Sequence, residues 1–115
     1  MRIFFRSFKY ALKGILKAIW EERNLKVHLL IAGIVICSGF YFQLSDTEWV
    51  LILLCIAMVI GLELINSAIE SLVDLISPEW NPLAGKAKDI AAGAVLFVSI
   101  ISLVVGILVF RKYIL

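Results

Sequence analysis

The sequence predicts an all-α membrane protein with three transmembrane helices, preceded by an amphipathic helix that lies on the membrane surface. Of its 115 residues, 63% are hydrophobic and 17% are charged, and the mean hydropathy of +1.04 exceeds that of soluble domains. The apolar residues gather into three runs that are long enough to cross a hydrocarbon layer about 30 Å thick. We expect residues 1–115 to form one membrane domain whose active site is built from the helices and their connections.

The pattern of residues 1–26 predicts that this segment forms the surface helix. Basic side chains recur every three or four positions, at Arg2, Arg6, Lys9, Lys13 and Lys17. Apolar side chains occupy the opposite side of the helix, at Phe4, Phe8, Leu12, Ile15 and Ile19. This pattern is typical of a helix in the plane of a membrane interface, and the alternative is a soluble helix docked on a protein core. No removable signal peptide is expected, because the basic start is not followed by a short apolar core with a cleavage site.

The three membrane helices are expected at residues 27–44, 49–77 and 83–112. The segment "SDTE" is expected to form the first turn, and "SPEWNP" the second, because Pro78 and Pro82 both disfavour a continuing helix. The second helix is longer than the membrane requires, since nearly 30 residues at 1.5 Å per residue extend for about 43 Å. Its polar C-terminal half should therefore reach the membrane interface.

The distribution of charge predicts the orientation. The basic N-terminal helix and the "GKAKD" segment fall on one side of the membrane, whereas Asp46 and Glu48 fall on the other. Only Arg111 and Lys112 oppose this asymmetry. By the positive-inside rule, the N-terminus and the "SPEWNP" loop are expected to be cytoplasmic.

Several kinds of chemistry have no support in the sequence. Cys37 and Cys55 lie inside apolar runs, where they are expected to be small buried hydrophobic residues and not a disulfide or a metal site. A single histidine, His28, offers no histidine metal cluster, and no GxxxxGK[ST] or GxGxxG loop is present to bind a phosphate. If the protein handles nucleotides, it does so with carboxylates, a metal ion and scattered basic groups.

The strongest candidate for a site is a polar stripe that follows the second apolar run. Glu63, Asn66, Glu70 and Asp74 are spaced by three, four and four residues, which places them along one side of a helix. One interpretation is a polar seam that joins helices, or an exposed face at the helix end. The other is a site for a divalent cation and a reacting hydroxyl, because carboxylates suit Mg²⁺ and acidic residues in membranes are usually functional.

Two further clusters are expected at the same level of the membrane. The "GKAKD" segment carries Lys86, Lys88 and Asp89 just before the third membrane helix, and its lysines could balance phosphate charge. They could equally be topology signals that contact lipid headgroups. The "WEERN" segment contributes Glu21 and Glu22 from another helix, so that two carboxylates from separate helices could share one metal ion.

These motifs resemble a known family. The segments "ELINSAIESLVD" and "SPEWNPLAGKAKDIAAGAVL", with "FKYALKG" and "ERN" nearer the start, are similar to the motifs of the small prokaryotic diacylglycerol kinases, which include the undecaprenol kinases. The resemblance extends over nearly the whole chain. It implies a homotrimer of three-span subunits with active sites between subunits at the cytoplasmic interface of a bacterial inner membrane.

The resemblance also implies roles for individual residues. Glu63 matches the general base for the lipid hydroxyl, and Glu22 and Glu70 match the ligands of the Mg²⁺ that accompanies ATP. The implied nucleotide-binding positions are Tyr10, Glu22, Asn66, Glu70, Glu79, Asn81, Lys88 and Asp89. The implied contacts with the lipid substrate are Asn24, Lys26 and Glu63. The physical chemistry agrees, because Glu63 lies nearest the apolar run, where a poorly hydrated carboxylate accepts a proton well, and Glu70 lies two turns closer to water.

The expected function is therefore a lipid kinase. It would transfer the γ-phosphoryl group of ATP to the hydroxyl of diacylglycerol or undecaprenol, giving phosphatidic acid or undecaprenyl phosphate. The "SPEWNPLAGKAKD" segment is closer to a branch of Gram-positive and related bacteria in which a polyprenol can be the substrate, so both lipids stay open. The alternatives are a non-enzymatic helical assembly subunit and a lipid phosphatase, and no nucleic-acid partner is expected.

Overall fold

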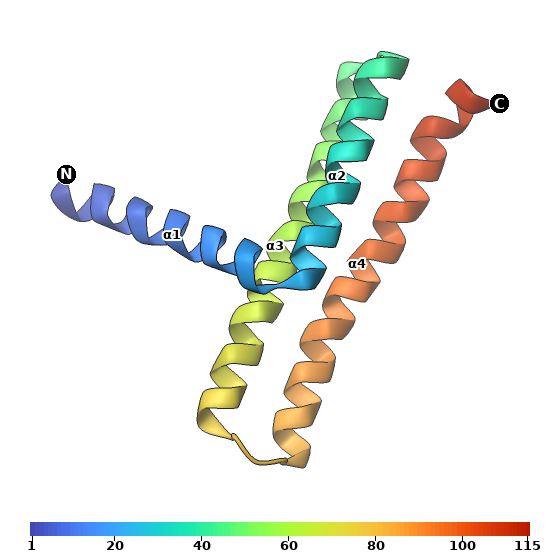
Figure 1. Cartoon of the computed structure of the whole chain (residues 1–115). Coiled ribbons are helices and arrows are strands. Elements are labelled where there is room, and N and C mark those ends of the chain that lie inside the picture. The colour runs from blue at the N-terminus through green and yellow to red at the C-terminus, as the bar shows by residue number, and fades with distance from the viewer.

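The computed structural model describes all residues 1–115 and contains four helices and no strand (Figure 1). The helices are α1 (Arg2–Glu21), α2 (Arg23–Phe42), α3 (Asp46–Ile76) and α4 (Pro82–Ile114). By length and composition, α2, α3 and α4 can each cross a membrane. The predicted fold class is thus confirmed.

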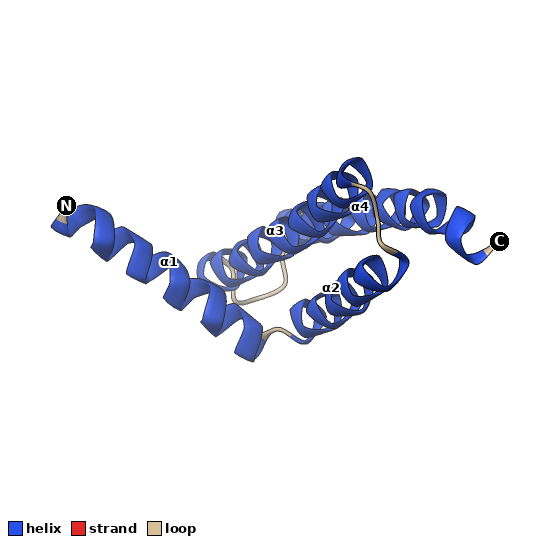
Figure 2. Ribbon diagram, turned by 90° about the horizontal axis from the view of Figure 1, so that it is seen from above, coloured by secondary structure: helices blue, strands red, loops and turns tan.

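The long helices α3 and α4 form an antiparallel hairpin, and α2 packs against α3 beside it (Figures 1 and 2). Helix α1 projects away from the start of α2, so that the molecule extends over 51 × 42 × 20 Å. Figure 1 also shows that α3 and α4 continue past the level of α1 to reach their connecting loop. The polar end of α3 therefore lies at and beyond the level of the surface helix.

A single extended residue separates α1 from α2. Glu22 has φ −101° and ψ 113°, so α1 ends at Glu21 and α2 begins at Arg23. We had expected the surface helix to include residues 21–26, but the structure assigns Asn24 and Lys26 to the first turn of α2. Leu25 is the physical reason, because its side chain is only 1% exposed and anchors the start of α2 in the protein. No residue of α1 is buried, which leaves its apolar side free for a membrane surface.

The turn between α2 and α3 is shorter than the sequence suggests. The motif "SDTE" was expected to form this turn, but its last three residues already form the first turn of α3. Ser45 is the reason, because its Oγ accepts a hydrogen bond from the backbone of Glu48 at 3.3 Å while its own N–H donates to Glu48 Oε1 at 3.0 Å. This reciprocal capping box satisfies two backbone donors that a helix start otherwise leaves unpaired.

Glu48 also connects the start of α3 to the end of α4. Tyr113 Oη donates to Glu48 Oε1 at 2.6 Å, and Lys112 Nζ lies 3.0 Å from Glu48 Oε2. A small apolar core formed by Leu44, Ile52 and Val109 lies beside this contact. Glu48 is 8% exposed and both of its carboxylate oxygens have partners, so this end of the hairpin is held by a buried carboxylate that bonds to Tyr113 and to the exposed Lys112.

The two prolines determine where the loop between α3 and α4 lies. Helix α3 ends at Ile76, and Pro82 occupies the first turn of α4, where its missing N–H costs nothing. Asn81 caps α4, because its Oδ1 accepts hydrogen bonds from Leu83 at 2.8 Å and from Ala84 at 3.4 Å. The expected helix break in "SPEWNP" is therefore present.

One close approach between α2 and α3 generates a stability prediction. A Cβ atom added to Gly39 would lie 2.6 Å from the indole of Trp49, which itself packs on Phe40 with ring centroids 4.9 Å apart. Gly39→Ala should therefore destabilise the protein by about 1–3 kcal/mol through overpacking. Gly33→Ala on the same helix meets nothing within 4 Å and should be neutral or stabilising. Thermal unfolding in detergent measures both, and equal melting temperatures for the two variants would contradict the packing argument.

Candidate active site

The polar stripe of α3 runs from a buried end to an exposed end. Glu63 is 3% exposed and Asn66 is 6% exposed, whereas Glu70 is half-buried and Asp74 is exposed. Asn66 Nδ2 donates a hydrogen bond to Glu70 Oε1 at 3.3 Å, and Asn66 Oδ1 is buried without a partner. The stripe therefore offers carboxylate and amide oxygens at graded depths, with one amide oxygen free to bind a ligand.

The buried end of the stripe has a partner on another helix. His28 Nε2, on α2, lies 3.7 Å from Glu63 Oε2. The sequence carries no signal for this contact, because a single histidine in an apolar run indicates neither a metal cluster nor a partner. No spacing within one helix could have revealed it, since His28 and Glu63 meet only when α2 packs against α3.

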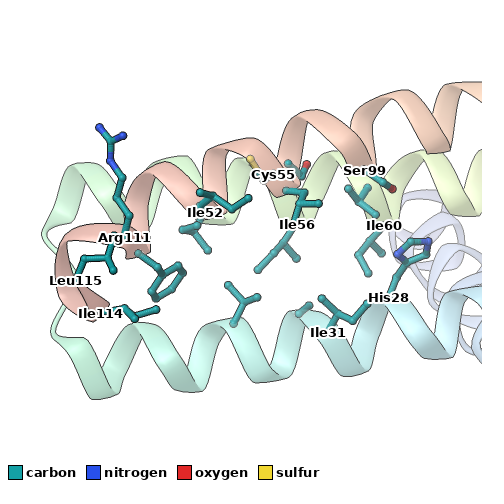
Figure 3. Close-up of a pocket in the computed structure, with 18 residues that line it drawn as sticks. His28, Ile31, Ile52, Cys55, Ile56, Ile60, Ser99, Arg111, Ile114 and Leu115 are labelled. Atoms are coloured by element: carbon teal, nitrogen blue, oxygen red, sulfur yellow. The ribbon is translucent and has the colours of Figure 1, made fainter.

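A large apolar cavity extends from His28 between α2, α3 and α4 (Figure 3). Its volume is about 610 Å³, which is within the range of small-molecule binding sites. The lining includes Ile52, Ile56 and Ile60 of α3, with His28 at one end and Leu115 near the other. The cavity is thus an apolar space within the membrane helices that has a polar end beside Glu63.

Helix α4 brings its basic segment to the exposed end of the stripe. Lys88 Nζ forms an ion pair with Asp74 Oδ1 across the hairpin. Lys88 was expected to balance phosphate charge. The structure places its ammonium group beside Asp74, which lies one helical turn beyond Glu70 in the polar stripe of α3. Asp89, next to Lys88 in the chain, is exposed.

The remaining predicted residues make no bond to the stripe. Glu22 is half-buried at the junction of α1 and α2, and Lys26 Nζ lies 5.9 Å from the centre of the Trp20 ring at the same junction. Tyr10, Asn24, Glu79 and Asn81 are all exposed. No hydrogen bond or ion pair joins any of these six residues to Glu63, Asn66 or Glu70. A single chain therefore brings together only part of the predicted site.

The oxygen ligands suit Mg²⁺, although one chain forms no complete metal cage. No three His, Cys, Asp or Glu side chains converge on one point. Mg²⁺ is usually bound by one or two carboxylates together with substrate phosphates and water, and does not need such a cage. The carboxylate of Glu70 and the unpartnered Oδ1 of Asn66 are oxygen donors of the right chemistry for this mode of binding.

Comparisons with known proteins agree on one family. The sequence model of the family described as "Prokaryotic diacylglycerol kinase" matches residues 9–110. The chain is 46% identical over 107 residues to a protein named undecaprenol kinase from Bacillus subtilis, covering 93% of this chain and 87% of that protein. It is 38% identical to a diacylglycerol kinase from Synechocystis, covering 87% of this chain and 58% of that protein. It is 35% identical to a diacylglycerol kinase from Haemophilus influenzae, covering 77% and 75%.

Proposed function

Since the chain belongs to the prokaryotic diacylglycerol kinase family and is a lipid kinase of the membrane, we propose that it transfers the γ-phosphoryl group of ATP to undecaprenol, with Glu63 as the general base. The observation that carries this proposal is the burial of Glu63 beside His28, which lines the polar end of the apolar cavity. The part of the lipid chain next to the hydroxyl group occupies the cavity, and the hydroxyl group lies at Glu63.

Undecaprenol is favoured over diacylglycerol by the comparisons. The relative named undecaprenol kinase is 46% identical to this chain, whereas those named diacylglycerol kinase are 33–38% identical. The product is undecaprenyl phosphate when undecaprenol is the acceptor. With diacylglycerol as the acceptor, the product is phosphatidic acid. A purely structural assembly subunit and a lipid phosphatase lose their support, because the family and its named members are kinases.

In the proposed transfer, the only bond that the protein itself forms is the one between Glu63 and the proton. Glu63 accepts the proton of the lipid hydroxyl, the hydroxyl oxygen forms a bond to the γ-phosphorus, and the bond from that phosphorus to the bridging oxygen of ATP breaks to release ADP. His28, 3.7 Å from Glu63, limits the positions that the carboxylate can occupy. Catalysis then depends mainly on holding the hydroxyl in line with the γ-phosphate.

The nucleotide binds at the exposed end of the stripe. Glu22 and Glu70 would hold Mg²⁺, which when bound would neutralise charge on the phosphates. Lys88 turns from Asp74 toward the phosphates, because their higher charge attracts its ammonium group more strongly. The other nucleotide-binding positions in this proposal are Tyr10, Asn66, Glu79, Asn81 and Asp89. Asn24 and Lys26 contact the lipid headgroup beside Glu63.

Neighbouring copies of the chain complete the sites. Tyr10, Glu22 and Glu79 form no hydrogen bond or ion pair with the stripe of their own chain, which supports a homotrimer whose sites lie between subunits. In this assembly the sites face the cytoplasm of a bacterium from its inner membrane. The basic N-terminal helix and the "GKAKD" segment support this orientation.

A paired assay tests the reaction and the choice of lipid. The purified protein, in mixed micelles with Mg²⁺ and γ-labelled ATP, should transfer label to undecaprenol with a higher kcat/KM than to diacylglycerol. Label in neither lipid would contradict the proposed reaction. Faster transfer to diacylglycerol would contradict only the choice of acceptor.

The general base is tested by Glu63→Gln. The amide has nearly the same shape but cannot accept the proton, so kcat should fall by about 10²–10⁴-fold while nucleotide binding and assembly are retained. The control is Asp46→Asn, which alters an exposed carboxylate at the other end of the same helix and should keep wild-type kcat. Wild-type turnover by Glu63→Gln would remove this residue from the mechanism.

The metal ligands are tested separately by Glu22→Gln and Glu70→Gln. Each change removes a charged oxygen ligand, so the Mg²⁺ concentration for half-maximal activity should rise by at least about tenfold. Titrations of activity against Mg²⁺ measure this, with Asp46→Asn again as the control. An unchanged Mg²⁺ dependence in either variant would reject that residue as a ligand.

A further inference from the structure

Ser99 of α4 differs from three other serines in the helices of this protein. The hydroxyl groups of Ser7, Ser38 and Ser71 each donate to the backbone carbonyl four residues earlier, at 2.9, 2.8 and 3.1 Å. This local bond is the usual way for a helical serine to satisfy its donor. Ser99 Oγ makes no such bond, and it is buried without any partner. A buried hydroxyl without a partner is unfavourable, so its native partner is expected to come from outside the chain.

The fold places Ser99 at the depth of Glu63. Lys88 of α4 pairs with Asp74 of α3, and the two helices run antiparallel. Ser99 lies 11 residues after Lys88, and Glu63 lies 11 residues before Asp74. The contact between Tyr113 and Glu48 at the other end of the hairpin agrees with this register. Ser99 and Glu63 are therefore at the same level on neighbouring helices.

The same residue lines the apolar cavity at its polar end. Figure 3 shows Ser99 and His28 at one end of the cavity, on α4 and α2, with Ile60 of α3 between them. The side chains around the middle of the cavity are mostly aliphatic. An oxygen atom at this end of a bound lipid would thus meet a free hydroxyl donor from α4 as well as the carboxylate of Glu63.

We propose that the Ser99 hydroxyl donates a hydrogen bond to the oxygen of the lipid alcohol whose proton Glu63 accepts. The inference rests on the proposed function and adds a substrate-positioning residue to it. Glu63 accepts the hydroxyl proton. Ser99 donates its hydrogen bond to one lone pair of the same lipid oxygen, and another lone pair of that oxygen attacks the γ-phosphorus. The bond strengthens as negative charge develops on that oxygen, so Ser99 contributes to kcat as well as to lipid binding.

The test compares Ser99→Ala with Ser38→Ala. Both remove one hydroxyl from a membrane helix, but Ser38 is already bonded to its own helix and does not line the cavity. Ser99→Ala should lower kcat/KM about tenfold with undecaprenol and with diacylglycerol alike. Ser38→Ala should keep wild-type kinetics, and Ser99→Thr, which retains a hydroxyl group, should recover most of the activity.

Thermal unfolding without lipid separates positioning from folding. Ser99→Ala should unfold at the wild-type temperature or above it, because the change removes an unpaired buried hydroxyl. A lower unfolding temperature with a parallel loss of activity would overturn the inference, as would wild-type kinetics in Ser99→Ala. A loss confined to diacylglycerol would also overturn it, by assigning the bond to an ester carbonyl. A wild-type protein that labels neither lipid would instead contradict the proposed function itself.

Discussion

The antiparallel pairing of α3 and α4 is the interaction on which the site depends. At one end of the hairpin, buried Glu48 binds Tyr113 and Lys112 and is joined to the capping box of Ser45. At the other end, Asp74 pairs with Lys88 in a solvent-exposed position, where ion pairs contribute little. The buried contact is therefore the one that holds the register. A slip of one helical turn would move Ser99 by 5.4 Å relative to Glu63 and separate the polar groups around the end of the cavity.

A gradient of polarity along α3 suits the proposed meeting of a lipid and a nucleotide at this hairpin. The half of α3 that lines the cavity presents aliphatic side chains, and the half beyond Gly61 presents the stripe of acids and amide. Glu63 lies at the boundary, shielded from water and beside His28. A buried carboxylate in a membrane is energetically unfavourable and usually marks a functional site. Acceptance of a proton from a hydroxyl that stays in the bilayer is a function that requires this position.

The sequence predicted the helices well because each one carries its own signal. Apolar runs identified α2, α3 and α4, and the prolines of "SPEWNP" identified the loop before α4. The boundaries differed where a tertiary contact or a side-chain cap extended a helix. Leu25 packs into the protein and starts α2 early, and Ser45 caps α3 at a point where "SDTE" resembles a turn. The stripe from Glu63 to Asp74 was predictable for the same reason, since its spacing is a property of one helix.

The sequence by itself determined the class of protein, its family and the side of α3 that carries the acids, because hydropathy, helical period and motif are all local. Only the tertiary structure decided which residues of other helices face that side. His28 and Ser99 give little signal in the sequence, because the polar residues at helical spacing from them, Asn24 and Ser102, do not extend into a stripe like that of α3. His28 lies beside Glu63 because α2 packs against α3, and Ser99 lies at the level of Glu63 because the contact of Glu48 with Tyr113 sets the register of α4.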